Sequence, residues 1–498
     1  MLLRQSIFSL LTAVLCARAQ TAPIIDLGYA RYQGAVDTAK NITNFLGIRY
    51  AAAPLGDLRF RAPQPPANVT GVQQATTEPN ECFQATSGQS ATNPLRSRAD
   101  EIIDTEDCLF LNVHYPSNAA GTPVGNLPTI VWIHGGGYLA GSASAFNGED
   151  LIRQSNRGIV AVIIQYRLGV FGFLPGAEVK KNGALNAGLR KFSAISKFGG
   201  DPSKVTIWGE SAGAGSVLQH VVANNGQTEP QLFRAAITSS TFLPSQYQFN
   251  DRIPEVGCTA ASDAMACLRA ADAATLETAN TNINLAGFFG TFLLVPVIDG
   301  TFITQRPTLS LLEGKVNGKT LLSFTNTFEG TIFVNQSITS TAAQYAFDLF
   351  PNFGQAQANE VEALYSGLGT SIFQDNAVQG ESIFICPTYT LLRAFPGRAF
   401  KGEFAIPPGL HGNDIVYYFP GTATPPFNNT VFINAFAQSF TSFAISLDPN
   451  WSLFDVGNTE MLFNETAAGA PDVRPITTSN ALLERCRFWE SVAALTAQ

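Results

Sequence analysis

The sequence has little positive charge, no long apolar segment beyond its first residues, and no repeats or low-complexity linkers. Its 498 residues include 30 Lys and Arg against 38 Asp and Glu, a formal net charge of −8. That acidic balance argues against a nucleic-acid ligand. Because no later run reaches the ~18 apolar residues of a spanning helix, we expect no transmembrane segment. The absence of a linker favours one large domain.

The first nineteen residues have the features of a secretory signal peptide. Arg4 precedes an apolar stretch at positions 7–16, and the small-residue pattern A-R-A occupies positions 17–19. Cleavage after Ala19 would leave a mature domain of residues 20–498. We therefore predict a secreted, extracellular protein.

The cysteine and asparagine patterns agree with a secretory route. Six cysteines follow the signal peptide, an even number that suits three disulfides in an oxidising compartment. Cys258 and Cys267 are close enough in sequence to form a local pair, whereas the spacing of the other four leaves their pairing open. Asn-x-Ser/Thr sequences that could accept glycans occur at Asn41, Asn68, Asn335, Asn428, Asn450 and Asn464.

Short, continuously apolar runs are the main indication of secondary structure. Such continuity fits strands that are covered on both faces, as in a parallel sheet. Residues 212–223 have the pattern of a helix. The sequence therefore predicts an α/β fold, a central mostly parallel sheet flanked by helices. The runs occupy residues 129–133, 159–166, 204–208, 235–238 and 320–324.

A candidate nucleophile lies between a predicted strand and a predicted helix. The pentapeptide G-E-S-A-G at 209–213 is a G-x-S-x-G sequence with Ser211 at its centre. Small residues around the serine permit the sharp turn that exposes its hydroxyl at the carboxyl end of a strand. The context favours an α/β-hydrolase fold with Ser211 as nucleophile. The neighbouring Glu210 is expected to support the site rather than to react.

Only four histidines can supply the base that a nucleophilic serine needs. In α/β-hydrolases the order along the chain is serine, acid, histidine, so His114 and His134 come too early. His220 lies on the helix that follows Ser211, which leaves no room for an acid-bearing strand. His411 remains, in a polar, glycine-containing loop.

The acid that orients this histidine must lie between Ser211 and His411, preferably where an apolar strand ends. Glu329 fits best, because it follows the predicted strand at 320–324. Asp299, at the end of the apolar run 293–298, is the alternative. Either residue could instead occupy a solvated turn, so at this point both stay open.

A glycine-rich loop can supply the oxyanion hole for acyl transfer. The sequence H-G-G-G at 134–137 directly follows the predicted strand at 129–133. Backbone N–H groups can approach a developing oxyanion only where side chains are absent. The expected donors are the N–H groups of Gly136, Gly137 and Ala212.

Together these motifs resemble the type-B carboxylesterase/lipase family, which includes cholinesterases and secreted fungal lipases and esterases. The resemblance extends to E-D-C-L-F-L-N-V at 106–113, the stretch 198–213, the segment 326–330 and the loop around His411. It implies that Ser211, Glu329 and His411 form a triad, which favours Glu329 over Asp299.

The resemblance also implies structural partners away from the chemistry. These are two further disulfides and two ion pairs of the scaffold. The implied disulfides are Cys82–Cys108 and Cys386–Cys486. The implied ion pairs are Arg59 with Glu106 and Arg167 with Asp201.

Two segments depart from the family pattern. Residues 190–197 replace a longer helix of the relatives, which is expected to weaken the support beneath the nucleophile strand. Residues 83–107 are mostly polar or charged, where lipase-like relatives carry an amphipathic lid. A polar lid predicts weak attraction to lipid surfaces and favours soluble or moderately apolar esters.

We therefore predict a carboxylic-ester hydrolase that acts through an acyl-enzyme intermediate on a small-molecule ester. No metal or organic cofactor is expected, and the sequence carries no indication of oligomeric state. One alternative is a lipase or sterol esterase whose pocket uses Phe288, Phe289 and Phe292, although clustered phenylalanines are more often core. An alternative of another class is a non-catalytic binding protein on the same fold.

Overall fold

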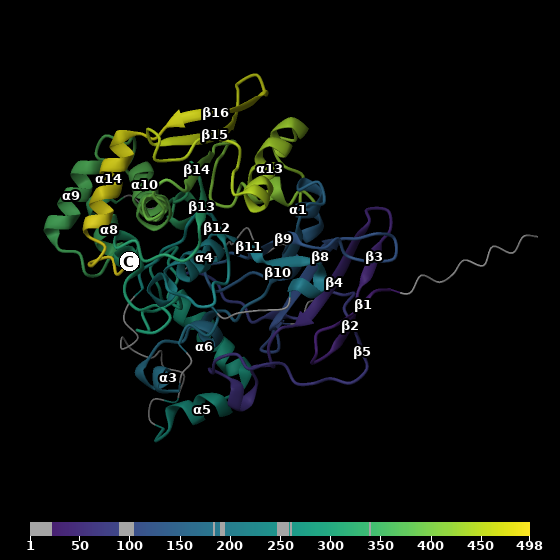
Figure 1. Cartoon of the computed structure of the whole chain (residues 1–498). Coiled ribbons are helices and arrows are strands. Elements are labelled where there is room, and N and C mark those ends of the chain that lie inside the picture. The colour runs from purple at the N-terminus through teal and green to yellow at the C-terminus, as the bar shows by residue number, and fades with distance from the viewer. Residues whose placement is uncertain are drawn as a thin grey trace, which may run out of the picture.

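The computed structural model describes residues 22–88, 104–182, 185–189, 195–246, 258, 261–337 and 340–498. One large twisted sheet runs through the middle of the molecule (Figure 1). Its strands, in spatial order, are β16 (Pro471–Thr477), β15 (Thr459–Glu465), β14 (Ala399–Phe404), β13 (Thr320–Asn326), β12 (Ala235–Ser239), β11 (Gly200–Glu210), β9 (Leu127–Ile133), β10 (Val160–Ile164), β8 (Phe110–Pro116), β4 (Ile42–Arg49) and β3 (Ala35–Asp37).

The central strands of this sheet are parallel, and the sheet turns antiparallel towards its two edges. From β10 to β15, each strand pairs in parallel with its neighbour. β16 at one edge, and β8, β4 and β3 at the other, pair antiparallel. The carboxyl ends of the parallel strands therefore meet along one side of the sheet. This architecture confirms the predicted α/β class.

Burial on both faces explains the continuous apolar runs. On β11, Ile207 packs into the core that contains α4 (Ala212–Val222), whereas Trp208 faces the core on the other side of the sheet. There Trp208 stacks on Phe440 of α13 (Thr430–Ser446), with ring centroids 4.6 Å apart. All five predicted runs overlap strands of the sheet, and the predicted helix at 212–223 is α4.

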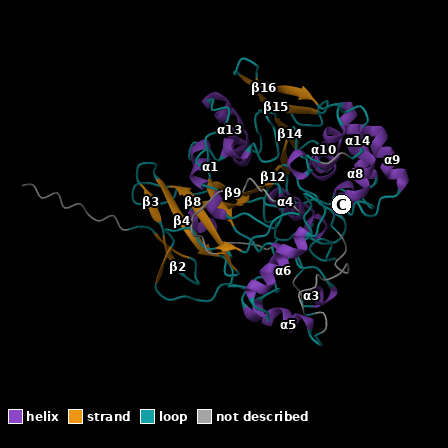
Figure 2. Cartoon of the chain, turned by 180° about the vertical axis from the view of Figure 1, so that it is seen from behind, coloured by secondary structure: helices purple, strands orange, loops and turns teal. Residues whose placement is uncertain are grey.

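The remaining helices surround the sheet in groups (Figure 2). One group lies beyond β13 and β14 and comprises α8 (Ala342–Leu349), α9 (Gln355–Tyr365), α10 (Ser371–Gly380), α11 (Cys386–Arg393) and α14 (Asn480–Ser491). The other helices are α1 (Gly148–Gln154), α2 (Gly169–Phe173), α3 (Ala177–Lys181), α5 (Ala264–Ala270), α6 (Ala273–Leu285), α7 (Pro307–Leu312) and α12 (Ile415–Tyr418). Small strands outside the main sheet are β1 (Ile24–Asp26), β2 (Arg31–Gln33), β5 (Val72–Gln74), β6 (Glu81–Cys82) and β7 (Asp104–Thr105).

Three disulfides connect the described cysteines. They comprise the local pair expected from spacing and the two pairs implied by the family resemblance. The bonds are Cys258–Cys267, Cys82–Cys108 and Cys386–Cys486.

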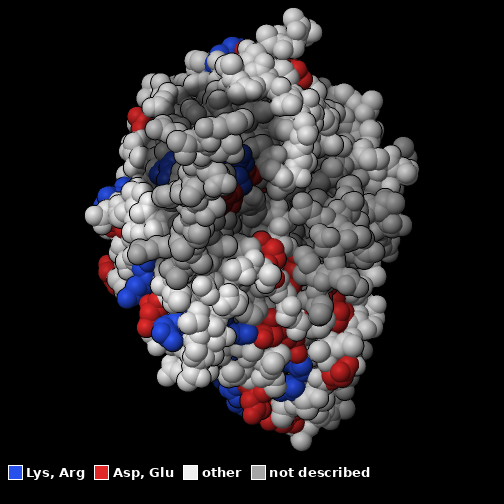
Figure 3. Space-filling model, turned by 90° about the vertical axis from the view of Figure 1, so that its right-hand side faces the viewer, with Lys and Arg blue, Asp and Glu red and all other residues white. Residues whose placement is uncertain are grey.

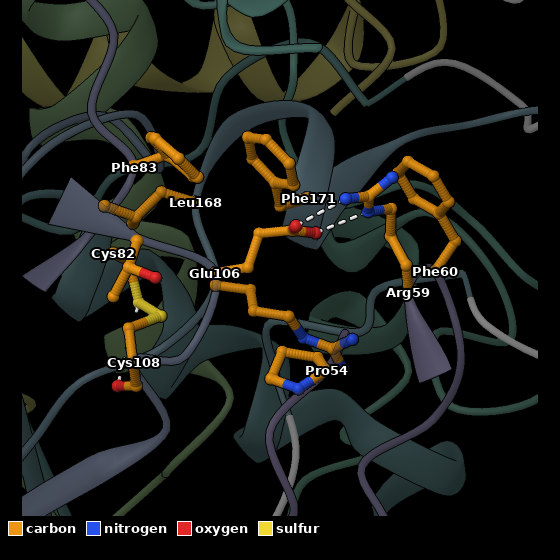
Figure 4. Close-up of a pocket in the computed structure, with 11 residues that line it drawn as sticks. Pro54, Arg59, Phe60, Cys82, Phe83, Glu106, Cys108, Leu168 and Phe171 are labelled. Atoms are coloured by element: carbon orange, nitrogen blue, oxygen red, sulfur yellow. Dashed lines mark hydrogen bonds and ion pairs between the residues drawn. A yellow bond between two sulfur atoms is a disulfide. The ribbon is translucent and has the colours of Figure 1, made fainter. Parts of the chain in front are cut away.

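The Arg59–Glu106 pair is present and buried beside the Cys82–Cys108 disulfide (Figure 4). The Arg59 Nε and Nη2 atoms each donate to one Glu106 carboxylate oxygen at 2.5 Å. A small, partly open cavity adjoins this pair and the stacked rings of Phe83 and Phe171. Both charges are fully engaged, so this cavity is a feature of the scaffold rather than a site with an exposed charge.

The other ion pair that the resemblance implies, Arg167 with Asp201, is not formed, so this prediction is wrong. Asp201, at the partly exposed start of β11, pairs with Lys204 at 3.1 Å. Arg167 is buried and directs its guanidinium to the backbone carbonyl oxygens of Arg61 and Ala187. The side chains lie in different environments because Asp201 is at the surface end of its strand.

Some predictions concern residues outside the described ranges or sites on the surface. The signal peptide at 1–19, residues 190–194 and residues 89–103 of the lid segment lie outside the described residues. Four of the possible glycan acceptors are exposed, namely Asn41, Asn68, Asn428 and Asn450. Asn335 and Asn464 are partly buried, and the side-chain oxygen of Asn464 is buried within β15.

The surface carries both signs of charge. Acidic and basic side chains are interspersed over the face shown in Figure 3. Within the described part of the chain, no helix combines the length and apolarity that crossing a membrane requires.

Candidate active site

Ser211 occupies a sharp turn between β11 and α4. Its backbone has φ 54° and ψ −123°, in the left-handed region that a non-glycine residue rarely adopts. The turn is tight enough that a Cβ on Gly209 would lie 2.3 Å from the carbonyl carbon of Gly213. A Cβ on Gly213 would lie 1.9 Å from the carbonyl oxygen of Ile133. Glycine at both positions therefore lets the chain place Ser211 at the carboxyl end of its strand.

Glu329 lies three residues after the end of β13 and is buried. Its Oε1 atom accepts hydrogen bonds from the Ser240 hydroxyl at 2.8 Å and from the Asn326 backbone N–H at 2.6 Å. Its Oε2 atom lies 2.6 Å from Nδ1 of His411. A buried carboxylate is stable only when such donors replace water, and Glu329 has three of them.

His411 is delivered by the loop that follows β14. The side chain of Asn413 accepts a hydrogen bond from the Leu410 backbone N–H at 3.0 Å, which closes the loop on itself. The loop also joins the acid segment, because the Phe328 N–H donates to the Gly409 carbonyl at 2.9 Å. His411 and Glu329, the candidate base and acid, are thus held by segments that follow adjacent parallel strands.

Two phenylalanine rings enclose the imidazole of His411. The Phe384 ring centroid lies 4.5 Å away and that of Phe333 lies 5.0 Å away. Burial of this kind is the largest single effect and lowers the pKa of His411, whereas the charge and the hydrogen bond of the adjacent Glu329 carboxylate raise it. Glu210 and Asp414 raise it further, so the net pKa lies above the ordinary 6.5.

Glu210 and Asp414 make this an unusually acidic environment. The Oε1 atom of Glu210 lies 3.4 Å from Nε2 of His411. Burial raises the pKa of Glu210 to about 8 and that of Asp414 to about 6. Asp414 accepts hydrogen bonds from Asn326 at 3.1 Å and from the Tyr418 hydroxyl at 3.0 Å. Asp414 therefore belongs to the wall of the site, where sequence reasoning did not place it.

The H-G-G-G loop reaches the turn that carries Ser211, as its position after β9 predicts. A Cβ on Gly135 would lie 3.0 Å from Cβ of Ser211, so the two backbones are in contact. Gly136 and Gly137 have φ of +96° and +65°. Among the described residues, no hydrogen bond engages the N–H group of either glycine. Two donors without a partner among the described residues therefore directly follow the glycine that contacts the serine turn.

The serine and the histidine are not hydrogen-bonded to each other among the described residues. The Ser211 side chain is nearly buried, and the closest recorded polar neighbour of His411 Nε2 is Glu210. In unliganded enzymes this hydrogen bond is often long and shortens in the substrate complex. Because Glu210 directly precedes Ser211, the contact of Glu210 with Nε2 brings His411 to the turn that carries the serine.

The alternative acid, Asp299, has a different role. Its Oδ1 atom accepts hydrogen bonds from the backbone N–H groups of Thr301 and Ile303, at 2.8 and 3.0 Å. Its Oδ2 atom accepts one from Asn186 at 2.9 Å. These contacts close a turn, and no described contact links Asp299 to His411. Within the described ranges, no cluster of His, Cys, Asp and Glu has metal-binding spacing.

The chain is similar to known proteins along most of its length. A model of the carboxylesterase family matches residues 21–489. The chain belongs to this family. As a family member it is a carboxylic-ester hydrolase, and its fold is that of the α/β-hydrolases. The predicted family, fold class and general activity are therefore confirmed.

Relatives of this carboxylesterase include fungal lipases and esterases. Lipase 2 of Diutina rugosa is 30% identical over 82% of this chain and 84% of its own. Carboxylesterase patB of Aspergillus clavatus is 28% identical over 94% of this chain and 96% of its own. Secreted triacylglycerol lipase LIP1 of Gibberella zeae is 32% identical over 73% of this chain and 66% of its own. The crystal structure of Aspergillus niger EstA superposes with a TM-score of 0.83 at 28% identity, covering 96% of this chain and 99% of that one.

Proposed function

We propose that this carboxylesterase uses Ser211 as nucleophile, His411 as general base and Glu329 as the residue that orients the histidine. The observation that carries the proposal is the 2.6 Å contact between His411 Nδ1 and Glu329 Oε2, beside the strained turn of Ser211. Segments that follow three parallel strands of the sheet, β11, β13 and β14, supply these residues. Such convergence at the carboxyl ends of strands is where α/β sheets build their sites.

The proposed reaction has two steps. His411 Nε2 takes the hydroxyl proton as Ser211 Oγ bonds to the ester carbonyl carbon, and the same proton passes to the departing alcohol as the C–O bond breaks. Water then attacks the acyl-enzyme, with His411 again taking a proton, and Ser211 is regenerated as the acid leaves. The N–H groups of Gly136, Gly137 and Ala212 would stabilise the oxyanion in both steps.

Four phenylalanine rings support an apolar acyl group of limited size. Phe242, Phe292, Phe333 and Phe384 form a closed circuit in which neighbouring centroids are 5.2 to 6.1 Å apart. Phe333 and Phe384 also pack against His411. Rings in mutual contact leave little room for a long chain, so we propose esters of short or medium acyl groups as substrates.

Phe288 and Phe292, which the sequence offers as pocket residues, lie in different places in the structure. Phe292 belongs to the circuit and lies directly over the oxyanion loop, since a Cβ on Gly137 would be 1.9 Å from its ring. Phe288 instead packs against Tyr345 of α8, with centroids 5.7 Å apart. Phe292 is therefore the one of these residues that we place beside the acyl group.

A lipase activity on long-chain esters is the second candidate. Its support is the similarity to proteins named lipases and an exposed apolar group beside the acid loop. That group comprises Phe328, Ile332 and Phe373, each more than two-fifths exposed. Such a surface could contact an apolar substrate phase. We favour the esterase because the rings that pack against His411 form a closed circuit.

We also propose that the protein acts outside the cell. Three disulfides form stably only in an oxidising compartment. The relative from Gibberella zeae is named a secreted lipase, and the first nineteen residues have the pattern of a signal peptide.

The test of the proposed function is the hydrolysis of p-nitrophenyl acetate, butyrate and palmitate by wild-type enzyme and by Ser211→Ala. We expect turnover that favours acetate or butyrate and that disappears in the variant. The variant should stay folded, because the Ser211 hydroxyl makes no hydrogen bond among the described residues. Preference for emulsified palmitate would establish the lipase instead. Activity retained by Ser211→Ala would exclude the assigned nucleophile.

A further inference from the structure

The segment that carries Phe384 is a π-helix. The helices α10 and α11 are continuous through η6 (Glu381–Ile385), a single wide turn with π hydrogen bonding. Such turns are rare and mostly persist at functional sites, because they are less favourable than α-helix unless other contacts hold them. Here the wide turn brings Phe384 to the His411 ring, with centroids 4.5 Å apart.

Contacts from the C-terminal region hold this π-helix in place. Arg485 of α14 donates two hydrogen bonds to the Glu381 carboxylate, at 2.6 and 2.7 Å. The Cys386–Cys486 disulfide ties the first residue of α11 to the same helix. α14 is therefore fastened to both ends of the turn that positions Phe384.

Gln498 extends this connection to a second segment of the pocket. Its side-chain Nε2 donates to the Ser382 carbonyl at 2.9 Å and to the Leu243 carbonyl at 2.6 Å. Ser382 belongs to the π-helix, two residues before Phe384. Leu243 directly follows Phe242, whose ring stacks on that of Phe384 at 5.4 Å. One buried amide thus bridges the two segments that carry facing rings.

Neighbouring contacts fix the amide in this orientation. The Gln498 Oε1 atom accepts a hydrogen bond from the Thr496 hydroxyl at 2.7 Å, so the NH₂ group must face the two carbonyls. The backbone carbonyl of Ala497 accepts from the Gln246 N–H at 2.7 Å. Gln498 is only 3% exposed, so water cannot readily replace its donors.

We propose that Gln498 is a positioning residue that sets the separation of the Phe242 and Phe384 rings and thereby the acyl-chain preference of the enzyme. The inference rests on the proposed function, because it assigns those rings to the acyl group. Loss of the two hydrogen bonds would leave two buried carbonyls without their donor, and the segments would relax to satisfy them. The rings would then close less tightly around a short acyl group.

The test compares kcat and KM for p-nitrophenyl butyrate and decanoate in wild-type enzyme, Gln498→Ala and Gln498→Glu. Glutamate matches the length of glutamine but cannot donate to the carbonyls when ionised. We expect both variants to shift the butyrate-to-decanoate ratio of kcat/KM towards decanoate by roughly fivefold or more. Gln64→Ala is the matched control and should leave the ratio unchanged, because the exposed Gln64 side chain donates to the nearby Ala62 carbonyl and, among the described residues, makes no other hydrogen bond.

Active-site titration with an organophosphate and thermal unfolding separate the outcomes. Full titration with a shifted ratio supports the proposal, since the nucleophile remains intact. An unchanged ratio, or an equal loss for both esters, would overturn it. Failure of both variants to fold would overturn it too, because Gln498 would then be required for the fold rather than for the spacing of the rings. If the proposed function itself is wrong, the wild-type activity will not depend on Ser211. The Ser211→Ala variant tests that point independently of the Gln498 variants.

Discussion

Replacing Glu329 with glutamine should abolish most of the activity through the histidine tautomer rather than through the fold. The Oε1 position of Glu329 faces two donors, the Ser240 hydroxyl and the Asn326 N–H. The amide oxygen of glutamine must therefore occupy that position, and its NH₂ group must face His411 Nδ1. An NH₂ donor there makes Nδ1 an acceptor and leaves the proton on Nε2, which can then no longer accept the proton of Ser211.

The wrong tautomer and the loss of a stabilising charge both raise the barrier to acyl transfer. In the serine protease triad, the corresponding acid-to-amide change lowers kcat about 10⁴-fold. We expect a decrease of roughly 10³- to 10⁴-fold here, which is about 4 to 5.5 kcal/mol of transition-state stabilisation. Because Glu329 raises the pKa of His411, the residual activity should also reach half its maximum at a lower pH than in wild type.

The assay is kcat/KM for p-nitrophenyl butyrate between pH 5 and 9, with circular dichroism to establish folding. Asp299→Asn is the control, since Asp299 is the other acid that the sequence allows. The asparagine NH₂ would face the Asn186 donor, so we expect a stability loss of about 1 to 3 kcal/mol with near-normal activity in the folded enzyme. Residual activity above a tenth in Glu329→Gln, or an equal loss in Asp299→Asn, would refute the assignment of the acid.

Two further substitutions examine the surroundings of the triad. Glu210→Gln removes a carboxylate that raises the pKa of His411, so the acid limb of the pH–activity profile should move to lower pH; a move to higher pH would contradict the electrostatic argument. Gly137→Ala places a methyl group in a left-handed position against a phenylalanine ring and should lower kcat by about 10²- to 10³-fold. Gly125→Ala, where a Cβ meets nothing within 4 Å, should behave as wild type. Similar losses of kcat in both variants would show that the loss does not arise from the oxyanion loop.

The strands that carry the site could be predicted because burial on both faces produces apolar runs without alternation. Residues 204–208 and 320–324 are runs of this kind, and both belong to central strands. The run at 293–298 resembles them but forms no strand. There the Asn186 side chain hydrogen-bonds to both the N–H and the carbonyl of Val297, which are the groups that a neighbouring strand would otherwise engage. A side chain from a distant segment leaves no local signal in the run itself.

The residues that line the site were harder to predict than those to which we assign the reaction. Ser211, the glycine loop and His411 stand in short polar motifs whose spacing reflects the chemistry. Phe333 and Phe384 pack against His411 but lie in apolar segments that read as ordinary core. Hydrophobicity alone records that a ring is buried and not what it is buried against. Asp414, three residues after the histidine, is the one acidic residue whose position in the sequence could have indicated this wall, but it stands in a polar loop where acidic residues are common.

Hydrogen-bond donors, rather than position in the sequence, decide which acid of this site can serve the histidine. Glu329, Glu210 and Asp414 all surround His411, and all are buried. Glu329 is held by the Ser240 hydroxyl and a backbone N–H as well as by the imidazole, so its ionised form is stabilised. Glu210 has the imidazole as its recorded polar partner, at 3.4 Å, and burial raises its pKa to about 8. Glu210 is therefore the less supported carboxylate, and Glu329 is the acid that we propose carries the charge that stabilises a protonated His411 during acyl transfer.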